Sequence, residues 1–161
     1  MTSEMISFEQ HVELCRYFQF DRLKRLVNDA PNDLERDVVL TTTFFILDRE
    51  VKADYLDTLK WGEYYVSYLS DHPDLPGEIR KPRNDILRRM AIIYENCDML
   101  DRAMEICDLA DFYGIHRDGT RGGFICRRKR LAAKLKARSE EGVRSPNQPL
   151  QATVGRCDEQ I

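Results

Sequence analysis

The stretch from residue 84 to residue 114, NDILRRMAIIYENCDMLDRAMEICDLADFYG, constrains the fold of this chain more than any other. Two amphipathic runs flank a short polar break at Asn96-Cys97-Asp98. In each run, apolar residues recur three and four positions apart, which places them in one stripe along a helix. The stripes consist of Ile86, Leu87, Met90, Ile93 and Tyr94 in the first run and of Leu100, Ala103, Met104, Cys107, Leu109 and Ala110 in the second. The pattern predicts two antiparallel helices joined by a short turn.

The order of large and small residues in this predicted hairpin resembles a tetratricopeptide repeat. The matching positions read Leu87-x2-Met90-Ala91-x2-Tyr94 and then Ala103-x3-Cys107-x2-Ala110. In that family, small residues let the two helices of a repeat approach closely, and the resemblance gives this role to Ala91 and Ala103. Three residues depart from the family's usual pattern: Cys107 stands in place of an aromatic, Asp98 in place of a turn glycine, and Ile115 near the place of a proline.

The resemblance covers about one repeat, residues 84–115, and the rest of the chain matches it less well. Trp61-x2-Tyr64-Tyr65-x2-Tyr68 imitates the first helix, but Gly77 falls where the second helix should carry its small residue. Phe8-x2-His11-Val12-x2-Cys15 departs in the same way. A single repeat cannot bury its own apolar face, and about three are needed for stability. The sequence therefore predicts an all-α fold, either a right-handed array with degenerate repeats or an irregular helical bundle.

Several shorter signals place the other helices. Ser7 and Gln10 predict a capping box that opens a helix running to about Phe18, with Tyr17 among its apolar members. A second short helix begins near Asp21 and ends before Pro31. A helix from Lys52 with an apolar stripe stops at Pro73, and the linker DHPDLPGEIRKPRND follows. The stripe consists of Tyr55, Leu56, Leu59, Tyr64, Tyr65, Tyr68 and Leu69.

Residues 33–52 carry conflicting signals. The run VVLTTTFFIL is rich in β-branched and aromatic residues, which favours a strand on propensity alone. Its apolar residues do not alternate, however, and Leu34, Val38 and Phe45 recur at near-helical spacing. A single strand would also have no partner elsewhere in the chain. We therefore predict a helix here and expect it to be the central buried helix of the fold.

The C-terminal part divides into a basic helix and a tail. GTRGGF predicts a loop, and residues 124–138 a basic helix whose narrow apolar edge includes Phe124, Ile125, Leu131 and Leu135. Repeat arrays often end on such a solvated capping helix. From residue 139 the composition shifts to small polar residues and prolines, which predicts a disordered tail over 139–161. The whole of 1–138 is predicted to form one domain.

Composition indicates a soluble cytoplasmic protein. Hydrophobic residues make up 42% of the 161 residues and charged residues 33%, which is typical of a globular domain covered in charge. No apolar run approaches the roughly 20 residues that span a membrane, and the N-terminus lacks the pattern of a secretory signal. The five cysteines contain no CxxC pair, so we expect reduced thiols, as in a cytoplasm.

Charge is unevenly distributed along the chain. Residues 119–138 carry eight basic side chains and no acidic one, whereas residues 1–118 carry 15 basic and 24 acidic side chains. The run Arg127-Arg128-Lys129-Arg130 has two interpretations. It is either a solvated cap that balances the acidic residues, or a nucleic-acid-binding surface whose affinity falls with salt. The second interpretation predicts one continuous basic face that joins residues 121–138 to Arg80, Lys81, Arg83, Arg88 and Arg89.

No motif in the sequence indicates catalysis. His11, His72 and His116 are not paired at metal-ligand spacing with other ligands. GTRGGF matches neither the P-loop nor the dinucleotide fingerprint, and no serine lies in a GxSxG elbow. We therefore predict a protein that is not an enzyme, with no catalytic, cofactor-binding or metal-binding residues.

The aromatic residues Trp61, Tyr64, Tyr65 and Tyr68 also have two interpretations. They form either a core stripe or a concave peptide-binding face, because tyrosine and tryptophan are common interface anchors. By resemblance, tetratricopeptide modules bind other polypeptides. The sequence thus favours a small cytoplasmic adaptor or scaffold that binds a peptide or a partner helix, with self-association left open. The alternative is a nucleic-acid-associated protein that uses the basic helix.

Overall fold

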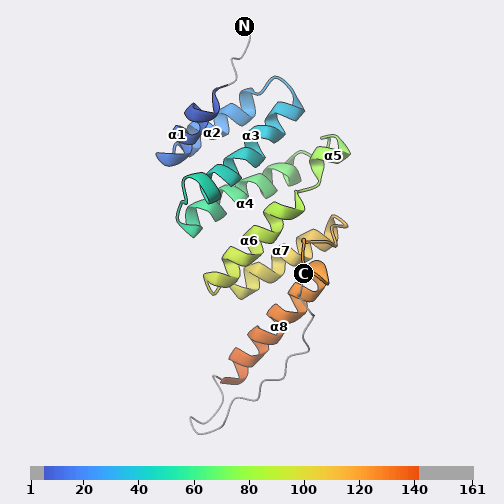
Figure 1. The fold of residues 1–161 in the computed structure, drawn as a ribbon. Coiled ribbons are helices and arrows are strands. Elements are labelled where there is room, and N and C mark those ends of the chain that lie inside the picture. Colours follow the sequence, from blue (N-terminus) through green and yellow to red (C-terminus); the bar gives the residue numbers. More distant parts are fainter. Residues whose placement is uncertain (1–5, 142–161) are drawn as a thin grey trace. The chain divides into compact units, whose positions relative to one another are not determined.

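The computed structural model describes residues 6–141, and this part of the chain is all-α, with no strand (Figure 1). It confirms the predicted fold class. The chain divides into two compact units, Met1–Pro82 and Arg83–Ile161, and the division falls in the predicted proline-rich linker. The prediction of one domain over 1–138 stays a prediction.

The first unit contains α1 to α5 and one π-helical turn, η1. Their bounds are α1 Phe8–Arg16, α2 Phe20–Asp29, α3 Asp33–Phe45, η1 Ile46–Glu50, α4 Tyr55–Asp71 and α5 Gly77–Arg80. The second unit contains α6 Asn84–Asn96, α7 Leu100–Phe112 and α8 Gly123–Glu141. Consecutive helices pack as hairpins, with α2 on α3, α3 on α4, α6 on α7, and α7 on α8 (Figure 1). The predicted linker contains the short helix α5.

The predicted capping box of α1 is present. The Ser7 hydroxyl accepts from Gln10 N at 3.1 Å, and Ser7 N donates to Gln10 Oε1 at 2.9 Å. The prediction that this helix runs to about Phe18 with Tyr17 inward is wrong. The helix ends at Arg16, the Tyr17 side chain is exposed, and Phe18 reverses the chain at φ +52°.

Residues 33–50 are helical, as predicted, but the side chains that meet the core are mostly not those whose spacing predicted the helix. Leu40, Phe44 and Leu47 are buried at spacings of four and three, whereas Leu34 and Val38 are exposed. The expectation of a central buried helix therefore fails at Leu34 and Val38, because spacing alone does not say which of two apolar faces meets the neighbouring helices. The buried Thr43 hydroxyl donates to Val39 O at 2.7 Å, so the helix accommodates its threonines without an unpaired group.

The core of the first unit is largely aromatic. Trp61 and Tyr65 of α4 are buried with Phe44 of α3, and the Trp61 Nε1–H donates to Leu40 O at 2.9 Å. That bond joins α4 to α3 and leaves the indole without an unpaired donor. The predicted α4 stripe is wrong at its start, because Tyr55 and Leu56 are exposed.

The predicted hairpin of residues 84–114 is confirmed. All five residues of the first stripe are buried in α6, and in α7 Leu100, Ala103, Cys107 and Ala110 are buried together with Ile106. Met104 and Leu109 are only half-buried. Ala91 and Ala103 have no exposed surface, which suits two helices in close approach. The relation to the tetratricopeptide family stays a prediction.

Three helices end in the same hydrogen-bonded motif. After α1, α6 and α7 the chain reverses at a residue in the left-handed region: Phe18 (φ +52°), Asp98 (φ +66°) and Gly114 (φ +72°). In each case two backbone N–H groups bond back to the last turn, as Met99 N does to Tyr94 O at 2.8 Å and Asp98 N to Glu95 O at 3.0 Å. This is the Schellman motif, in which glycine is the preferred reversing residue. Asp98 therefore occupies a turn position that usually holds glycine.

The basic helix α8 begins at Gly123 and runs to Glu141, so residues 139–141, predicted as tail, are helical. The remainder of the predicted tail lies outside the described residues. Phe124 and Leu131 are buried, whereas Ile125 is exposed and Leu135 half-buried, so Ile125 is wrongly predicted as part of the apolar edge. Ile125 lies about 120° around α8 from Leu131, because six residues along a helix turn about 240° beyond one full turn.

Candidate functional site

The basic helix α8 is held by acidic residues of its own unit. Arg127 is buried, and its Nε donates to Asp118 Oδ2 at 2.8 Å, although neither side chain is more than 4% exposed. Asp118 also accepts hydrogen bonds from the backbone N and the hydroxyl of Thr120. Burial alone would raise the pKa of Asp118, but the bonds from Thr120 and Arg127 outweigh it and lower that pKa below its usual value. The pair fixes the loop before α8 onto the helix.

Further along α8, most basic side chains pair with carboxylates of α6 and α7. Glu95 accepts from Arg130 Nη2 at 3.1 Å and from Lys134 Nζ. These two cations lower the pKa of Glu95 although its partial burial acts to raise it. The remaining pairs are Arg128 with Asp108 and Arg138 with Asp98. Three of the four predicted basic site residues, Arg127, Arg128 and Arg130, thus form ion pairs. The fourth, Lys129, is exposed and forms no ion pair with residues 6–141.

These contacts favour the capping interpretation of the basic run. A cation held by a nearby carboxylate contributes little to the attraction of a phosphate backbone. The predicted continuous basic face is also interrupted, because Arg127 is only 4% exposed and Arg128 and Arg130 each contact a carboxylate.

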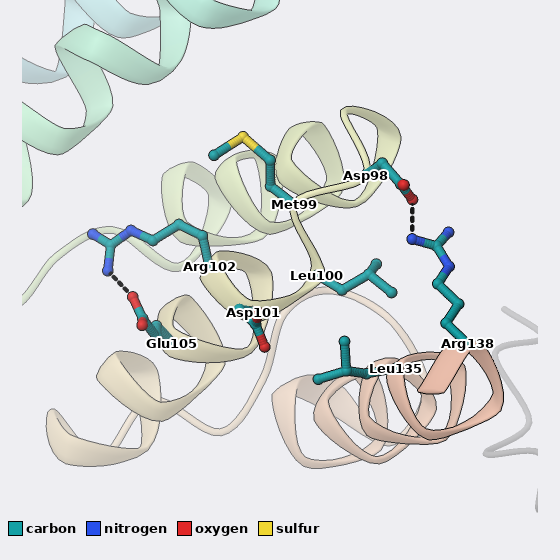
Figure 2. Close-up of a pocket in the computed structure, with 8 residues that line it drawn as sticks. All are labelled: Asp98, Met99, Leu100, Asp101, Arg102, Glu105, Leu135 and Arg138. Carbon is teal, nitrogen blue, oxygen red and sulfur yellow. Dashed lines mark hydrogen bonds and ion pairs between the residues drawn. The ribbon is translucent and has the colours of Figure 1, made fainter. Parts of the chain in front are cut away.

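An open pocket of about 370 Å³ lies where the turn between α6 and α7 meets the C-terminal part of α8 (Figure 2). Leu100 and Leu135 form its apolar wall, and the Asp98–Arg138 ion pair lies beside them. Arg102 Nη1 contacts Glu105 Oε2 at 2.6 Å on the opposite side. Because most of its charged groups are already paired, this pocket offers no strong recognition of an ion.

The predicted aromatic site residues are mainly part of the core. Trp61, Tyr65 and Tyr68 are buried, which favours the core interpretation, and Tyr64 is half-buried. The rings form a row along α4, with centroid distances of 4.9 Å from Trp61 to Tyr64 and 6.1 Å from Tyr64 to Tyr68. Lys24 Nζ of α2 lies 5.0 Å from the Tyr64 ring centroid, so a cation of the same unit already covers that ring.

The most exposed apolar stripe of the first unit lies on α3 instead. Leu34 is 66% exposed and Val38 49% exposed, and Phe45 is half-buried. These three residues, which we call the α3 stripe, lie within about 40° of one another around the helix. In the sequence these three residues indicated only a helix that was expected to be buried, since an apolar residue at helical spacing carries no mark that distinguishes a core face from a binding face.

The buried titratable groups do not form a reactive centre. Burial raises the pKa of the Cys15 thiol to about 12 and that of Cys107 to about 11, so both stay protonated and poorly nucleophilic at neutral pH. Cys15, Cys97 and Cys107 are free. His11 Nε2 lies 2.7 Å from the Thr43 hydroxyl, and burial lowers the pKa of this histidine.

Within residues 6–141, no group of three or more histidine, cysteine or acidic side chains is arranged to hold a metal ion. None of the described helices combines the length and the apolar character that crossing a membrane requires.

Comparison of the chain with protein-family models, with curated proteins and with solved structures finds no match.

Proposed function

We propose that the chain is a non-enzymatic interaction module, an adaptor or scaffold that binds a peptide or a helix of a partner protein. The observation that carries this proposal is the α3 stripe. A helix in a small helical domain normally buries its apolar residues on one face and exposes polar ones on the other. α3 buries Leu40 and Phe44 on one face and exposes Leu34 and Val38 on another.

Exposed apolar residues that follow helical spacing are typical of surfaces that bind a second helix. An amphipathic partner helix places residues at spacings of three and four against such a stripe and removes both apolar surfaces from water. Leu34 and Val38 are one helical turn apart, which is the spacing that a partner helix of this kind would meet. Glu35 and Asp37 lie between these two positions and flank the stripe, each about 60° around the helix from one of its members.

The proposal is tested by site-specific photo-crosslinking in cells of the native host. A photoreactive amino acid placed at Val38 should form a covalent adduct with another polypeptide, whereas the same group at the exposed Ser67 of α4 should not. The adduct should disappear in a Leu34→Asp variant. Because Leu34 is exposed, this substitution should leave the far-ultraviolet circular dichroism of the protein unchanged.

The captured protein then has to be verified as a binding partner. The purified pair should have a Kd that rises about tenfold or more in the Leu34→Asp variant, since burying a carboxylate against an apolar surface is costly. Adducts that form equally at positions 38 and 67, or a Kd unchanged by Leu34→Asp, would contradict the proposal.

A further inference from the structure

The loop between α7 and α8, residues 113–122, borders an open pocket of about 530 Å³ in the second unit. The pocket is lined by His116, Arg117, Gly119, Thr120, Gly122 and Gly123. Asn84 at the start of α6 holds this loop, because its Nδ2 donates to Arg117 O at 3.4 Å. The loop and the first turns of α6 therefore lie together at one end of the unit.

Arg88 of α6 reaches this loop and lacks an acceptor there. A Cβ atom at Gly119 would lie only 3.2 Å from Arg88 Nη1, so the guanidinium group is packed against the loop backbone. Arg88 Nε is enclosed and makes no hydrogen bond, and none of the carboxylates in residues 6–141 forms an ion pair with this side chain. An enclosed donor without an acceptor destabilises a protein and is uncommon, so the geometry indicates an acceptor that the described chain does not supply.

The charge around the pocket is positive. Arg117 and Arg121 are exposed and form no ion pair with the described residues. The loop's one carboxylate, Asp118, has no exposed side-chain surface and is already bonded to Arg127 and Thr120. Arg117 in the pocket lining and Arg88 beside Gly119 thus have no neutralising acid in the loop, and an anion would satisfy them.

The backbone contributes little to this anion site. At the start of α8, Gly123 N donates to Thr120 O at 3.3 Å, Phe124 N to His116 O at 3.1 Å and Cys126 N to Gly122 O at 3.4 Å. Recognition would therefore rest on the arginine side chains. The planar fork of a guanidinium group matches the oxygen atoms of a phosphate, and arginine clusters are a common means of recognising phosphorylated peptides.

The residues that line the pocket also discriminate between kinds of phosphate ligand. None of them is aromatic, so the pocket offers no ring on which a nucleobase could stack. We propose that Arg117, which lines the pocket, and Arg88, whose Nη1 lies beside Gly119, bind a phosphate monoester, the group carried by a phosphorylated serine or threonine of a partner protein. This site is separate from the α3 stripe, and it stands or falls independently of the function proposed for that stripe.

Titration of the purified full-length protein with O-phospho-L-serine tests the proposal. Binding is followed by amide chemical shifts at low ionic strength, with L-serine and with sodium chloride of equal ionic strength as controls. We expect saturable shifts for residues of the loop 113–122 with O-phosphoserine alone. Shifts that do not saturate, or that chloride reproduces, would show that the proposal is wrong.

Charge-matched variants locate the site. Arg88→Gln should raise the Kd for O-phosphoserine about tenfold, because it removes a charge-assisted hydrogen bond. Lys129→Gln removes the same charge from an exposed position of α8 and should leave the Kd within about twofold. The exposed Arg117→Gln should also weaken binding without disturbing the fold, so a poorly folded Arg88→Gln would not prevent the test. Equal effects of Arg117→Gln and Lys129→Gln would overturn the proposal.

A single-stranded RNA oligonucleotide serves as the competing ligand. We expect it to bind more weakly than O-phosphoserine per phosphate group, because the pocket lacks stacking rings. RNA binding that depends on Arg88, without binding of O-phosphoserine, would replace the monoester proposal with a nucleic-acid one.

Discussion

The two units are held together by different kinds of contact. In the first unit, Phe44, Trp61 and Tyr65 fill the core, and the ion pairs Arg16–Glu13 and Arg36–Asp33 join residues three apart on one helix. In the second unit the core is mainly aliphatic, and Arg102–Glu105 lies within α7, but five ion pairs join α8 to the loop before it or to the preceding hairpin. These are Arg127–Asp118, Arg128–Asp108, Arg130–Glu95, Lys134–Glu95 and Arg138–Asp98.

The difference shows what a concentrated charge run does in a helical protein. The basic run of α8 first suggests an external partner, but its acids are supplied by the preceding hairpin of the same unit. The helix docks through both apolar contacts at Phe124 and Leu131 and a border of ion pairs. We therefore expect the stability of the second unit to depend on salt and pH through the ion pairs of α8. The stability of the first unit should depend mainly on the volume of its core side chains.

The largest expected effect is that of Trp61→Ala in the first unit. The substitution removes the largest buried side chain and leaves Leu40 O without its side-chain donor, which should lower the free energy of unfolding by about 3–5 kcal/mol. Amide hydrogen exchange, followed residue by residue, should show faster exchange in α3 and α4. Tyr64→Ala, at the half-buried neighbouring ring, serves as the control and should cost much less. Comparable losses in the two variants would contradict a core centred on Trp61.

In the second unit, Asp118→Ala should have the next largest effect. It leaves the Arg127 guanidinium buried without its carboxylate, and breaking such a pair destabilises a protein by about 3 kcal/mol. The control, Asp108→Ala, breaks a pair in which both side chains are about half-exposed, and should change stability by less than about 1 kcal/mol. Hydrogen exchange in α8 measures both. A double variant, Asp118→Ala with Arg127→Met, should recover part of the loss, and no recovery would show that the ion pair is not the cause.

A pH titration should distinguish the units as well. The Thr43 hydroxyl donates to Val39 O and so accepts from His11 Nε2–H, and burial of the ring favours its neutral form. Burial lowers the pKa of His11 in the folded state. The contribution of the neutral ring to the free energy of unfolding is therefore complete above the pKa of about 6.5 in the unfolded state, and it is lost as the pH falls from there towards the pKa of the folded state. The protection factors of the α1 amides, which correct for the slower intrinsic exchange at lower pH, should therefore fall between neutral and mildly acidic pH, and His11→Gln should abolish this change.

Asp118 and Glu95 should destabilise the second unit, at α8, and only at a lower pH than the one that affects α1 in the first unit. Their folded pKa values are lowered, so their contribution is complete above the unfolded values of about 3.9 and 4.3 and is lost as the pH falls through the folded values. The protection factors of the α8 amides should consequently stay high at the mildly acidic pH that lowers those of α1. Loss of protection in α8 before α1 would contradict the assignment of these groups.

The smallest predicted effect concerns the helix ends. Gly114 adopts φ +72° and has open space around it, so Gly114→Ala tests conformation alone and should destabilise α7 by about 1 kcal/mol. Gly77 has equally open surroundings without a positive φ, and Gly77→Ala should be neutral or slightly stabilising. Thermal denaturation of the two variants provides the comparison. Equal Tm values would show that the left-handed conformation of Gly114 is not strained by a Cβ.

Several features of the fold were predictable from the sequence because they depend on near neighbours. Helical periodicity identified the α6–α7 hairpin, and Ser7 with Gln10 identified the start of α1, since both signals arise within one or two turns of chain. The helical state of residues 33–50 followed from the absence of alternation, against the strand propensity of their threonines and aromatic residues.

What the sequence could not determine was which surface each side chain would meet. Leu34 and Leu40 are alike in the sequence, and only the packing of α2 and α4 on α3 buries the second and exposes the first. The eight basic residues of 119–138 were visible as a charge run, but the pairing of five of them with Glu95, Asp98, Asp108 and Asp118 depends on the docking of α8 onto α6 and α7. Local interactions set the helices, whereas burial and ion pairing depend on distances between residues far apart in the chain. For that reason the unpaired Arg88 beside Gly119 became visible only in the tertiary structure.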